Sequence, residues 1–156
     1  MSAPTTPARP SLRSWTPAQR FALLFGAVYV AVGIAGFAVT GFSDFTGMHH
    51  DTLLIFSVNP AHNVIHLALG LAWLAAAPHH RAAKTVNLVV GVVLGLVTVL
   101  GLADGMGVLG MSGLADPDNF LHLATATLAL YFGSLAAGSF AERDPAEAPL
   151  SDVPAL

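Results

Sequence analysis

The sequence predicts an all-α integral membrane protein, a bundle of four transmembrane helices built from a tandem two-helix repeat. Of its 156 residues, 54% are hydrophobic and only 10% are charged, whereas a soluble domain carries roughly 25% charged residues. A single domain of this length has too little interior to bury so much hydrocarbon in water. Four apolar segments are long enough to cross a bilayer, and a polar motif in the second recurs 56 residues later in the fourth.

The composition also excludes several classes of protein. The chain has no cysteine, which rules out disulfides, thiolate metal sites and thiol catalysis. Its formal net charge of -3 argues against a nucleic-acid partner. We therefore expect membrane lipid as the main partner, with other membrane subunits or a second copy of the chain as further candidates.

The first apolar segment follows a polar tail. Residues 1–20 are rich in Pro, Ser, Thr and Ala and are predicted to be disordered. Residues 21–41 carry no charge, and as a helix they are about 31 Å long, which matches the bilayer core. A cleavable signal peptide is the alternative, but its apolar region would run for only about 7–15 residues. We therefore predict an uncleaved first span.

The second and fourth apolar segments begin with the same pair of signals. Asn59 and Asp116 are good N-cap residues, and Pro60 and Pro117 suit the first helical position, where the missing N–H costs nothing. Each pair predicts a helix start. The predicted spans of the membrane domain are 21–41, 60–77, 85–103 and 119–138.

The remaining segments contribute packing signals and loops. Gly91 and Gly95 in the third span have the Gly-x-x-x-Gly spacing that allows close contact between membrane helices. The apolar run 52–56 is too short to span and is expected to lie along the surface. Residues 139–156 form a polar, proline-containing tail.

Basic residues indicate how the chain is oriented. All six fall in the N-terminal tail, in the turn between the second and third spans, or in the C-terminal tail, and four spans place these three segments on one side. The basic residues are Arg9, Arg13, Arg20, Arg81, Lys84 and Arg143. The positive-inside rule makes that side cytoplasmic. We predict a multi-pass protein of the cytoplasmic (inner) membrane with both termini in the cytoplasm.

The repeated polar motif is the candidate functional site. Its first copy contains His62, Asn63 and His66, and its second contains Asp118, Asn119 and His122 at the equivalent positions. Each unit has two spans, so the copies run in the same direction and their axis of pseudo-symmetry is expected along the membrane normal. Both copies lie at the outer ends of their spans.

The spacing within each copy is typical of a metal site. His62 and His66 are four residues apart and project from one helix face, as do Asp118 and His122. If the two faces meet, three imidazoles and one carboxylate converge, a ligand set for zinc, copper, iron or nickel.

The residues around these candidate ligands have predicted supporting roles. Asn63 and Asn119 would orient the ligands. Gly70 and Ala126 lie one turn deeper and are expected to let the two helices come close.

Other interpretations of the motif remain open. Polar side chains on membrane helices often only hydrogen-bond across a helix interface, so the two copies could form a structural clasp without any metal. His66 and His122 could instead be axial ligands of a haem, although no basic residue lies on the outer side to pair with the propionates. Imidazoles beside a carboxylate also suit a sensor of pH.

The same residues resemble a known family. The run from Val58 to Leu67 with Gly70, and the run from Asp118 to Leu123, are similar to a bacterial family of small four-span membrane proteins catalogued as domain of unknown function 4383. The resemblance covers about residues 20–138 and departs from the family at Ala126, where members usually have glycine. It implies the four-span topology and brings no established activity, substrate or cofactor.

The sequence predicts a function only in outline. No catalytic residue set is recognisable, and no chain of ionisable groups continues through the spans as proton-coupled transport requires. We predict a non-enzymatic accessory or sensing subunit organised around the histidine cluster. The alternative is a metal- or haem-binding component of a redox or enzyme system that uses the same residues.

Overall fold

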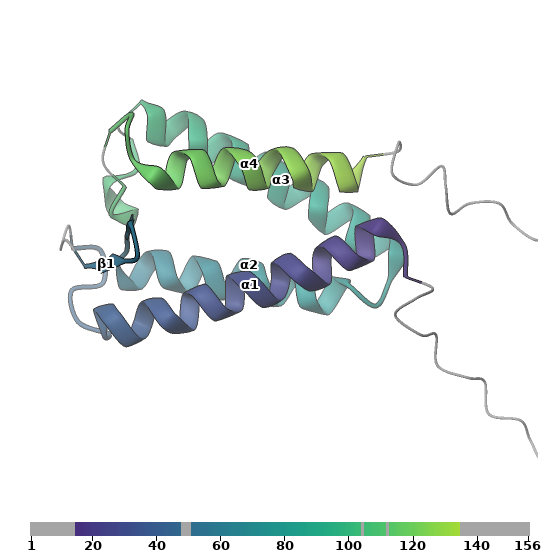
Figure 1. The fold of residues 1–156 in the computed structure, drawn as a ribbon, viewed down its shortest axis with the longest axis horizontal. Coiled ribbons are helices and arrows are strands. Elements are labelled where there is room, and N and C mark those ends of the chain that lie inside the picture. Colours follow the sequence, from purple (N-terminus) through teal and green to yellow (C-terminus); the bar gives the residue numbers. More distant parts are fainter. Residues whose placement is uncertain (1–14, 48–50, 104, 112, 135–156) are drawn as a thin grey trace, which may run out of the picture.

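Four helices dominate the chain (Figure 1). The structure is a computed structural model that describes residues 15–47, 51–103, 105–111 and 113–134. In chain order the helices are α1 (Pro17–Thr40), α2 (Pro60–Ala76), α3 (His80–Leu102) and α4 (Pro117–Gly133). By length and composition, α1 and α3 are apolar enough to cross a membrane. The mostly helical fold and these two candidate spans indicate a membrane protein.

Side-chain caps fix where three of the helices begin. Thr16 and Gln19 form a capping box at the start of α1. Asn59 caps α2, its Oδ1 accepting from the His62 N–H at 2.9 Å, and the Asp116 carboxylate accepts from the Asp118 N–H at 3.0 Å at the start of α4. Proline follows the cap in all three helices. The Asn-Pro and Asp-Pro pairs therefore act as helix starts, as the sequence predicts.

The helix ends differ from the predicted span ends by a few residues. α1 begins at Pro17 and α3 at His80, so both extend into polar sequence that hydropathy assigned to a tail or turn. In α1 the capping box at Thr16 and Gln19 starts the helix ahead of its apolar section; α3 begins early without a side-chain cap. α4 ends at Gly133, and Ser134 has extended backbone. Residues 135–138 of the predicted fourth span and most of both predicted tails lie outside the described residues.

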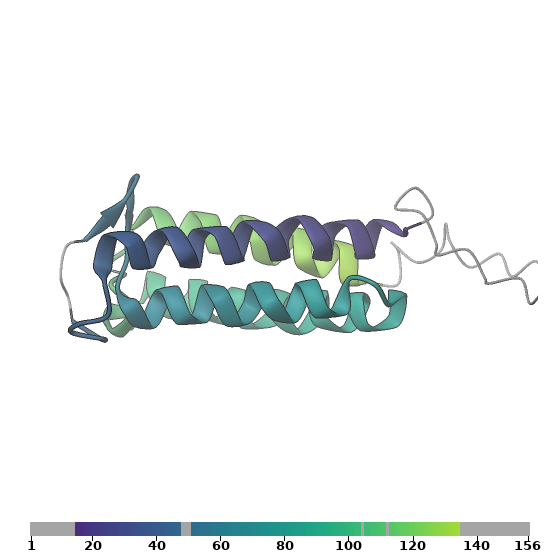
Figure 2. The same ribbon diagram turned by 90° about the horizontal axis from the view of Figure 1, so that it is seen from below.

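Short structures fill the loops. The run expected along the surface forms a hairpin of β1 (Thr52–Leu53) and β2 (Phe56–Ser57), paired antiparallel. Its tip exposes 86% of Leu54 and 67% of Ile55. Before α4, a 3-10 turn, η2 (Gly107–Leu109), ends at Gly110 in the left-handed conformation. The hairpin and η2 lie at one end of the helices (Figure 2).

The helices pack as two pairs. α1 lies against α2 and α3 against α4 along most of their lengths, and both views show the two pairs stacked (Figures 1 and 2). α2 and α4 belong to different pairs and pack on each other much less than each packs on its own partner, so their side chains meet across the interior. We call the end with the hairpin and η2 the loop end, and the opposite end, where α1 begins and α4 ends, the tail end.

Glycines allow the close contacts within each pair. A Cβ at Gly70 would lie 2.7 Å from the Val30 nitrogen and 2.9 Å from the Gly26 oxygen, and a Cβ at Gly91 would lie 2.8 Å from Leu130 on α4. Gly70 therefore brings α2 close to α1, rather than to α4 as its place in the motif suggested. The reason is that α4 lies across the interior from α2.

Two other predicted packing positions have different surroundings. Ala126 is 3% exposed and belongs to the buried core. Gly95, by contrast, has no atom of another element within 4 Å of where its Cβ would be. The buried stripe of α3 runs through Gly91, Leu94 and Thr98, so Gly95 lies beside the stripe and makes no close contact.

Candidate metal centre

Three histidines meet inside the loop end. His62 and His66 come from α2 and His122 from α4, and one ring nitrogen from each lies within 4.8 Å of the other two. The ring centroids are 4.4 Å apart for His62 and His66, 5.8 Å for His62 and His122, and 6.4 Å for His66 and His122. All three side chains are buried, with exposures of 1%, 5% and 2%. We call these residues the histidine trio.

The start of α2 positions the first of these histidines. The Asn59 side chain caps the helix through its oxygen, while its Nδ2 donates to the Val108 oxygen at 3.0 Å and to the Gly47 oxygen at 3.3 Å. One asparagine thus joins α2, η2 and the loop after α1. Because His62 is three residues after Asn59, the same bonds hold its ring beneath η2.

Aromatic rings support the second histidine. The Tyr29 ring of α1 stands edge-on to His66 at 5.1 Å and edge-on to Trp73 at 5.0 Å. The Tyr29 hydroxyl lies near the Thr125 side chain without completing a hydrogen bond of ordinary geometry. His66 is therefore held by packing, which leaves its ring nitrogens unengaged by α1.

Several buried ring nitrogens have no hydrogen-bond partner among the described residues. They are both nitrogens of His62 and the Nδ1 atoms of His66 and His122. Backbone groups of Ser57 and Leu109 approach the His62 ring, but no bond of ordinary geometry results. The large majority of buried side-chain polar atoms in folded proteins have a hydrogen-bond partner, so this cluster of unpaired nitrogens is available to a water molecule or a metal ion.

The acidic residues are arranged differently from the predicted ligand set. Asp118 is buried at 1% exposure, but it is not among the residues whose ligand atoms converge, and its charge acts on Tyr29 instead. Asp116 is the carboxylate whose charge acts on both His62 and His122. Asp116 stands one residue before the helix, where its carboxylate accepts from the Asp118 N–H, whereas Asp118 belongs to the first helical turn.

The two asparagines of the motif bind backbone and hydroxyl groups rather than imidazoles. Asn63 Nδ2 donates to the Thr40 hydroxyl at 3.0 Å, and Asn119 Nδ2 donates to the Gly113 oxygen at 3.0 Å. Within the described ranges, neither makes the bond between α2 and α4 that a structural clasp requires. Both amides are buried, at 0% and 1% exposure.

Each asparagine also fits against a glycine of the preceding helix. A Cβ at Gly36 would overlap the Asn63 amide, and a Cβ at Gly101 would overlap the Asn119 amide. Gly36 and Gly101 are 65 residues apart, and the two asparagines are 56 residues apart. Both helix pairs thus contain a glycine–asparagine contact of the same kind, although the two glycines are not separated by the 56 residues of the repeat.

One cavity connects the three histidines. It has a volume of about 140 Å³ and lies between α2, α3, α4 and η2. Apart from the imidazoles, its walls are apolar. Its lining residues are His62, His66, His122, Ile65, Leu69, Val93, Leu94, Val97, Met106 and Leu109.

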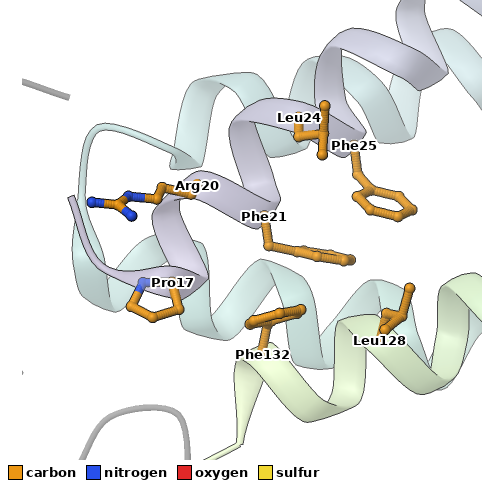
Figure 3. A pocket seen from close by; sticks show the side chains of 7 residues that line it. All are labelled: Pro17, Arg20, Phe21, Leu24, Phe25, Leu128 and Phe132. Carbon is orange, nitrogen blue, oxygen red and sulfur yellow. The ribbon is translucent and has the colours of Figure 1, made fainter. Parts of the chain in front are cut away.

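A larger cavity lies at the tail end, between α1 and α4 (Figure 3). Its volume is about 330 Å³, and its floor includes the stacked rings of Phe21 and Phe132, 5.1 Å apart. The remaining lining is apolar apart from Arg20, which Figure 3 places at one edge. Because no metal-ligating side chain lines it, the candidate metal centre belongs to the smaller cavity.

Comparison with known families assigns the chain. Residues 19–135, well over half of the chain, match the family described as Domain of unknown function (DUF4383). The chain belongs to this family. The DUF4383 match covers nearly all of α1 and the whole of α2, α3 and α4. Its description gives no activity, and comparison with curated proteins and with solved structures gave no match.

Two residues near the core of this DUF4383 chain were missed by the sequence analysis. Asn87 is fully buried, accepts from the Trp73 indole at 2.9 Å and donates to the Ala18 oxygen at 3.2 Å. The signal that could have identified Asn87 is its position as a single asparagine inside an otherwise apolar predicted span. The sequence analysis interpreted Asp116 only as a helix cap. Its position in the sequence did not indicate that Asp116, rather than Asp118, is the carboxylate whose charge acts on the trio.

Proposed function

We propose that this chain is a four-span membrane protein that binds one divalent transition-metal ion through His62, His66 and His122. The observation that carries the proposal is the convergence of three buried imidazoles whose nitrogens lack partners among the described residues. Neutral imidazole is a common ligand for zinc, copper, nickel and iron. Asp116, whose charge acts on two of the histidines, offsets part of the charge that such an ion would add.

The distances suit a metal after a small inward movement. Zinc binds histidine nitrogen at about 2.0–2.1 Å, so tetrahedral ligands lie roughly 3.3 Å from one another. The nitrogens of the trio lie within 4.8 Å of one another. Side-chain rotations that move each nitrogen inward by about 1 Å are enough. The cavity of about 140 Å³ favours an ion over haem, because cofactor sites usually occupy roughly 300–1,000 Å³.

The four-span topology is part of the same proposal. α2 and α4 each have 17 residues, about 26 Å of helix, which is at the short limit for a span. In the described structure, the basic residues of α1 and α3 lie in the first two turns of these helices, at the tail end. They are Arg20, Arg81 and Lys84. The positive-inside rule then makes the tail end cytoplasmic and puts the trio on the outer side.

The shared glycine–asparagine contact supports a tandem repeat. Gly36 with Asn63 and Gly101 with Asn119 occupy equivalent places in the two helix pairs. Two unrelated helix pairs would have no reason to use the same contact at the same end. We propose that the membrane domain arose from a duplicated two-helix unit.

The lining of the cavity favours an accessory or sensing role over catalysis. Apart from the Met106 thioether, the side chains around the trio are aliphatic, and they supply neither a nucleophile nor a carboxylate in the cavity wall. A bound ion there would stabilise the loop end and report metal availability on the outer side. We therefore propose a non-enzymatic membrane subunit.

Elemental analysis of the detergent-purified protein tests metal binding. We expect close to one zinc, copper, nickel or iron per chain, and loss of that metal in the double variant His66→Ala, His122→Ala. The control is His79→Ala, which removes an exposed imidazole at the opposite end of α2. Protein that stays metal-free after incubation with each of these ions would contradict the proposal.

The absence of native cysteine makes the topology easy to test. Single cysteines are introduced at Leu54, which is 86% exposed at the hairpin tip, and at Arg81, at the start of α3. In intact cells a membrane-impermeant maleimide should label Leu54→Cys, and should label Arg81→Cys only after lysis. Equal labelling of both positions in intact cells would exclude the proposed orientation.

A further inference from the structure

We infer that a metal held by the histidine trio keeps one coordination position open to a small, uncharged ligand that enters from the bilayer. The inference rests on the proposed metal site and adds to it the class of ligand that the site takes. Three features of the cavity carry it: the place of the histidines in its wall, its size, and the chemistry of the rest of its lining.

The place of the histidines determines where the open position lies. All three belong to the wall of one cavity, so an ion that they share lies at that wall. Tetrahedral sites with three protein ligands hold a water or substrate in the fourth position, unlike structural sites with four. Asp118, the predicted fourth ligand, lies outside the converging group. The fourth position therefore faces the cavity.

The size of the cavity limits the ligand. A volume of about 140 Å³ is more than one water molecule requires, since a water occupies roughly 30 Å³ of liquid. It is less than the roughly 300 Å³ at which sites for drug-sized molecules begin. The ligand that fits has only a few non-hydrogen atoms.

The lining determines the charge of the ligand. Beyond the imidazoles, the wall consists of aliphatic side chains and Met106, so an ion entering the cavity would lose its hydration without gaining a hydrogen bond from the wall. An uncharged molecule with a lone pair avoids that cost and still donates to the metal. The lining therefore disfavours an anion at every contact except the one with the metal itself.

The outer edge of the cavity faces the side of the helices. Ile65 of α2 and Val93 of α3 both line the cavity and are 39% and 41% exposed. In a four-span protein this side surface contacts acyl chains. Access is therefore between α2 and α3, and the ligand reaches the metal after partitioning into lipid.

The test uses the full chain in detergent, loaded with Co²⁺, whose visible spectrum changes with the number of ligands. At pH 8, we expect 1-methylimidazole, which is small and uncharged, to change the spectrum saturably. Azide, a small anion, should bind at least tenfold more weakly. Val97→Phe fills the cavity and should keep one Co²⁺ per chain while weakening 1-methylimidazole at least tenfold. Val99→Phe, the same change at a 63% exposed position of α3, should leave binding unchanged.

Separate outcomes test the inference and the metal site beneath it. A protein that binds Co²⁺ and shows no spectral change with 1-methylimidazole keeps its metal site and overturns the open position. Stronger binding of azide overturns the selection by charge. If Val97→Phe lowers Co²⁺ content, Val93→Phe at the cavity edge replaces it, and unchanged probe affinity in that variant overturns the cavity as the binding place. Failure to bind Co²⁺ at all overturns the inference together with the metal site.

Discussion

A single added methyl group at Gly101 should destabilise the loop end. A Cβ there would overlap the Asn119 amide and lie 3.0 Å from the Met111 side chain. Asn119 is 1% exposed and donates to the Gly113 oxygen at 3.0 Å, and Met111 is also buried. Neither neighbour has free space, so Gly101→Ala must displace the asparagine that holds the loop before α4.

The magnitude follows from three contributions. Overpacking of a well-packed interior costs about 1–3 kcal/mol. Loss of the hydrogen bond from Asn119 to Gly113 costs about 1 kcal/mol. Alanine in place of glycine within a helix regains about 1 kcal/mol. We therefore expect the free energy of unfolding to fall by about 1–3 kcal/mol.

The assay is reversible unfolding in mixed micelles with increasing sodium dodecyl sulfate, followed by tryptophan fluorescence, because Trp73 is fully buried. Gly95→Ala is the matched control: it makes the same change in the same helix where no atom of another element lies within 4 Å. It should leave stability unchanged or raise it slightly. Gly36→Ala should destabilise as much as Gly101→Ala, since it meets Asn63 in the same way. Equal stability of Gly101→Ala and Gly95→Ala would refute the reasoning.

Three further changes have defined outcomes. Trp73→Phe removes the indole donor of the buried Asn87 carbonyl, so the free energy of unfolding should fall by about 1–3 kcal/mol, measured in the same micelles but followed by circular dichroism at 222 nm for both proteins, because the variant lacks the fluorescent reporter; no change would mean that the pair contributes nothing. Asn59→Ala removes the cap of α2 and both side-chain hydrogen bonds to the loops. We expect the free energy of unfolding to fall by about 0.5–2 kcal/mol and Co²⁺ to bind more weakly. Unaltered metal affinity would exclude Asn59 as a positioning residue. Acidification from pH 7.5 to 5 should release the metal, because protons compete with the ion for imidazole lone pairs and affinity therefore falls as pH falls; metal that dialysis at pH 5 leaves bound would argue against imidazole ligands.

Local signals in the sequence predicted the helix starts well. Asn59 and Asp116 each cap a helix that proline then begins, because these effects depend only on residues within one turn. The i, i+4 spacing of His62 and His66 likewise follows from helix geometry alone. The convergence of these two histidines with His122 could not be predicted in this way, since it depends on how helices of two different pairs face a shared interior.

Contacts between elements were the part that sequence could not supply. Gly70 was expected to bring α2 toward α4, yet its open face meets α1, because a small residue indicates close packing without naming the neighbour. Asp118 and Asp116 differ by two positions, and only the turn at the start of α4 decides which one acts on the trio. Asn87 was missed for a similar reason, as its partners Trp73 and Ala18 lie on two other helices.

The unequal contribution of the two motif copies has a consequence for stoichiometry. His62 and Asp118 stand at matching positions of the copies, and only the histidine reaches the others. Matching helix pairs would offer two identical half-sites, and a ligand on the axis between them would contact both alike. Here one copy gives two imidazoles and the other gives one, so an ion bound as proposed would lie off that axis. The described residues hold no second, symmetry-related group of three such ligands, and a ratio near two ions per molecule would point to a different location for the second ion.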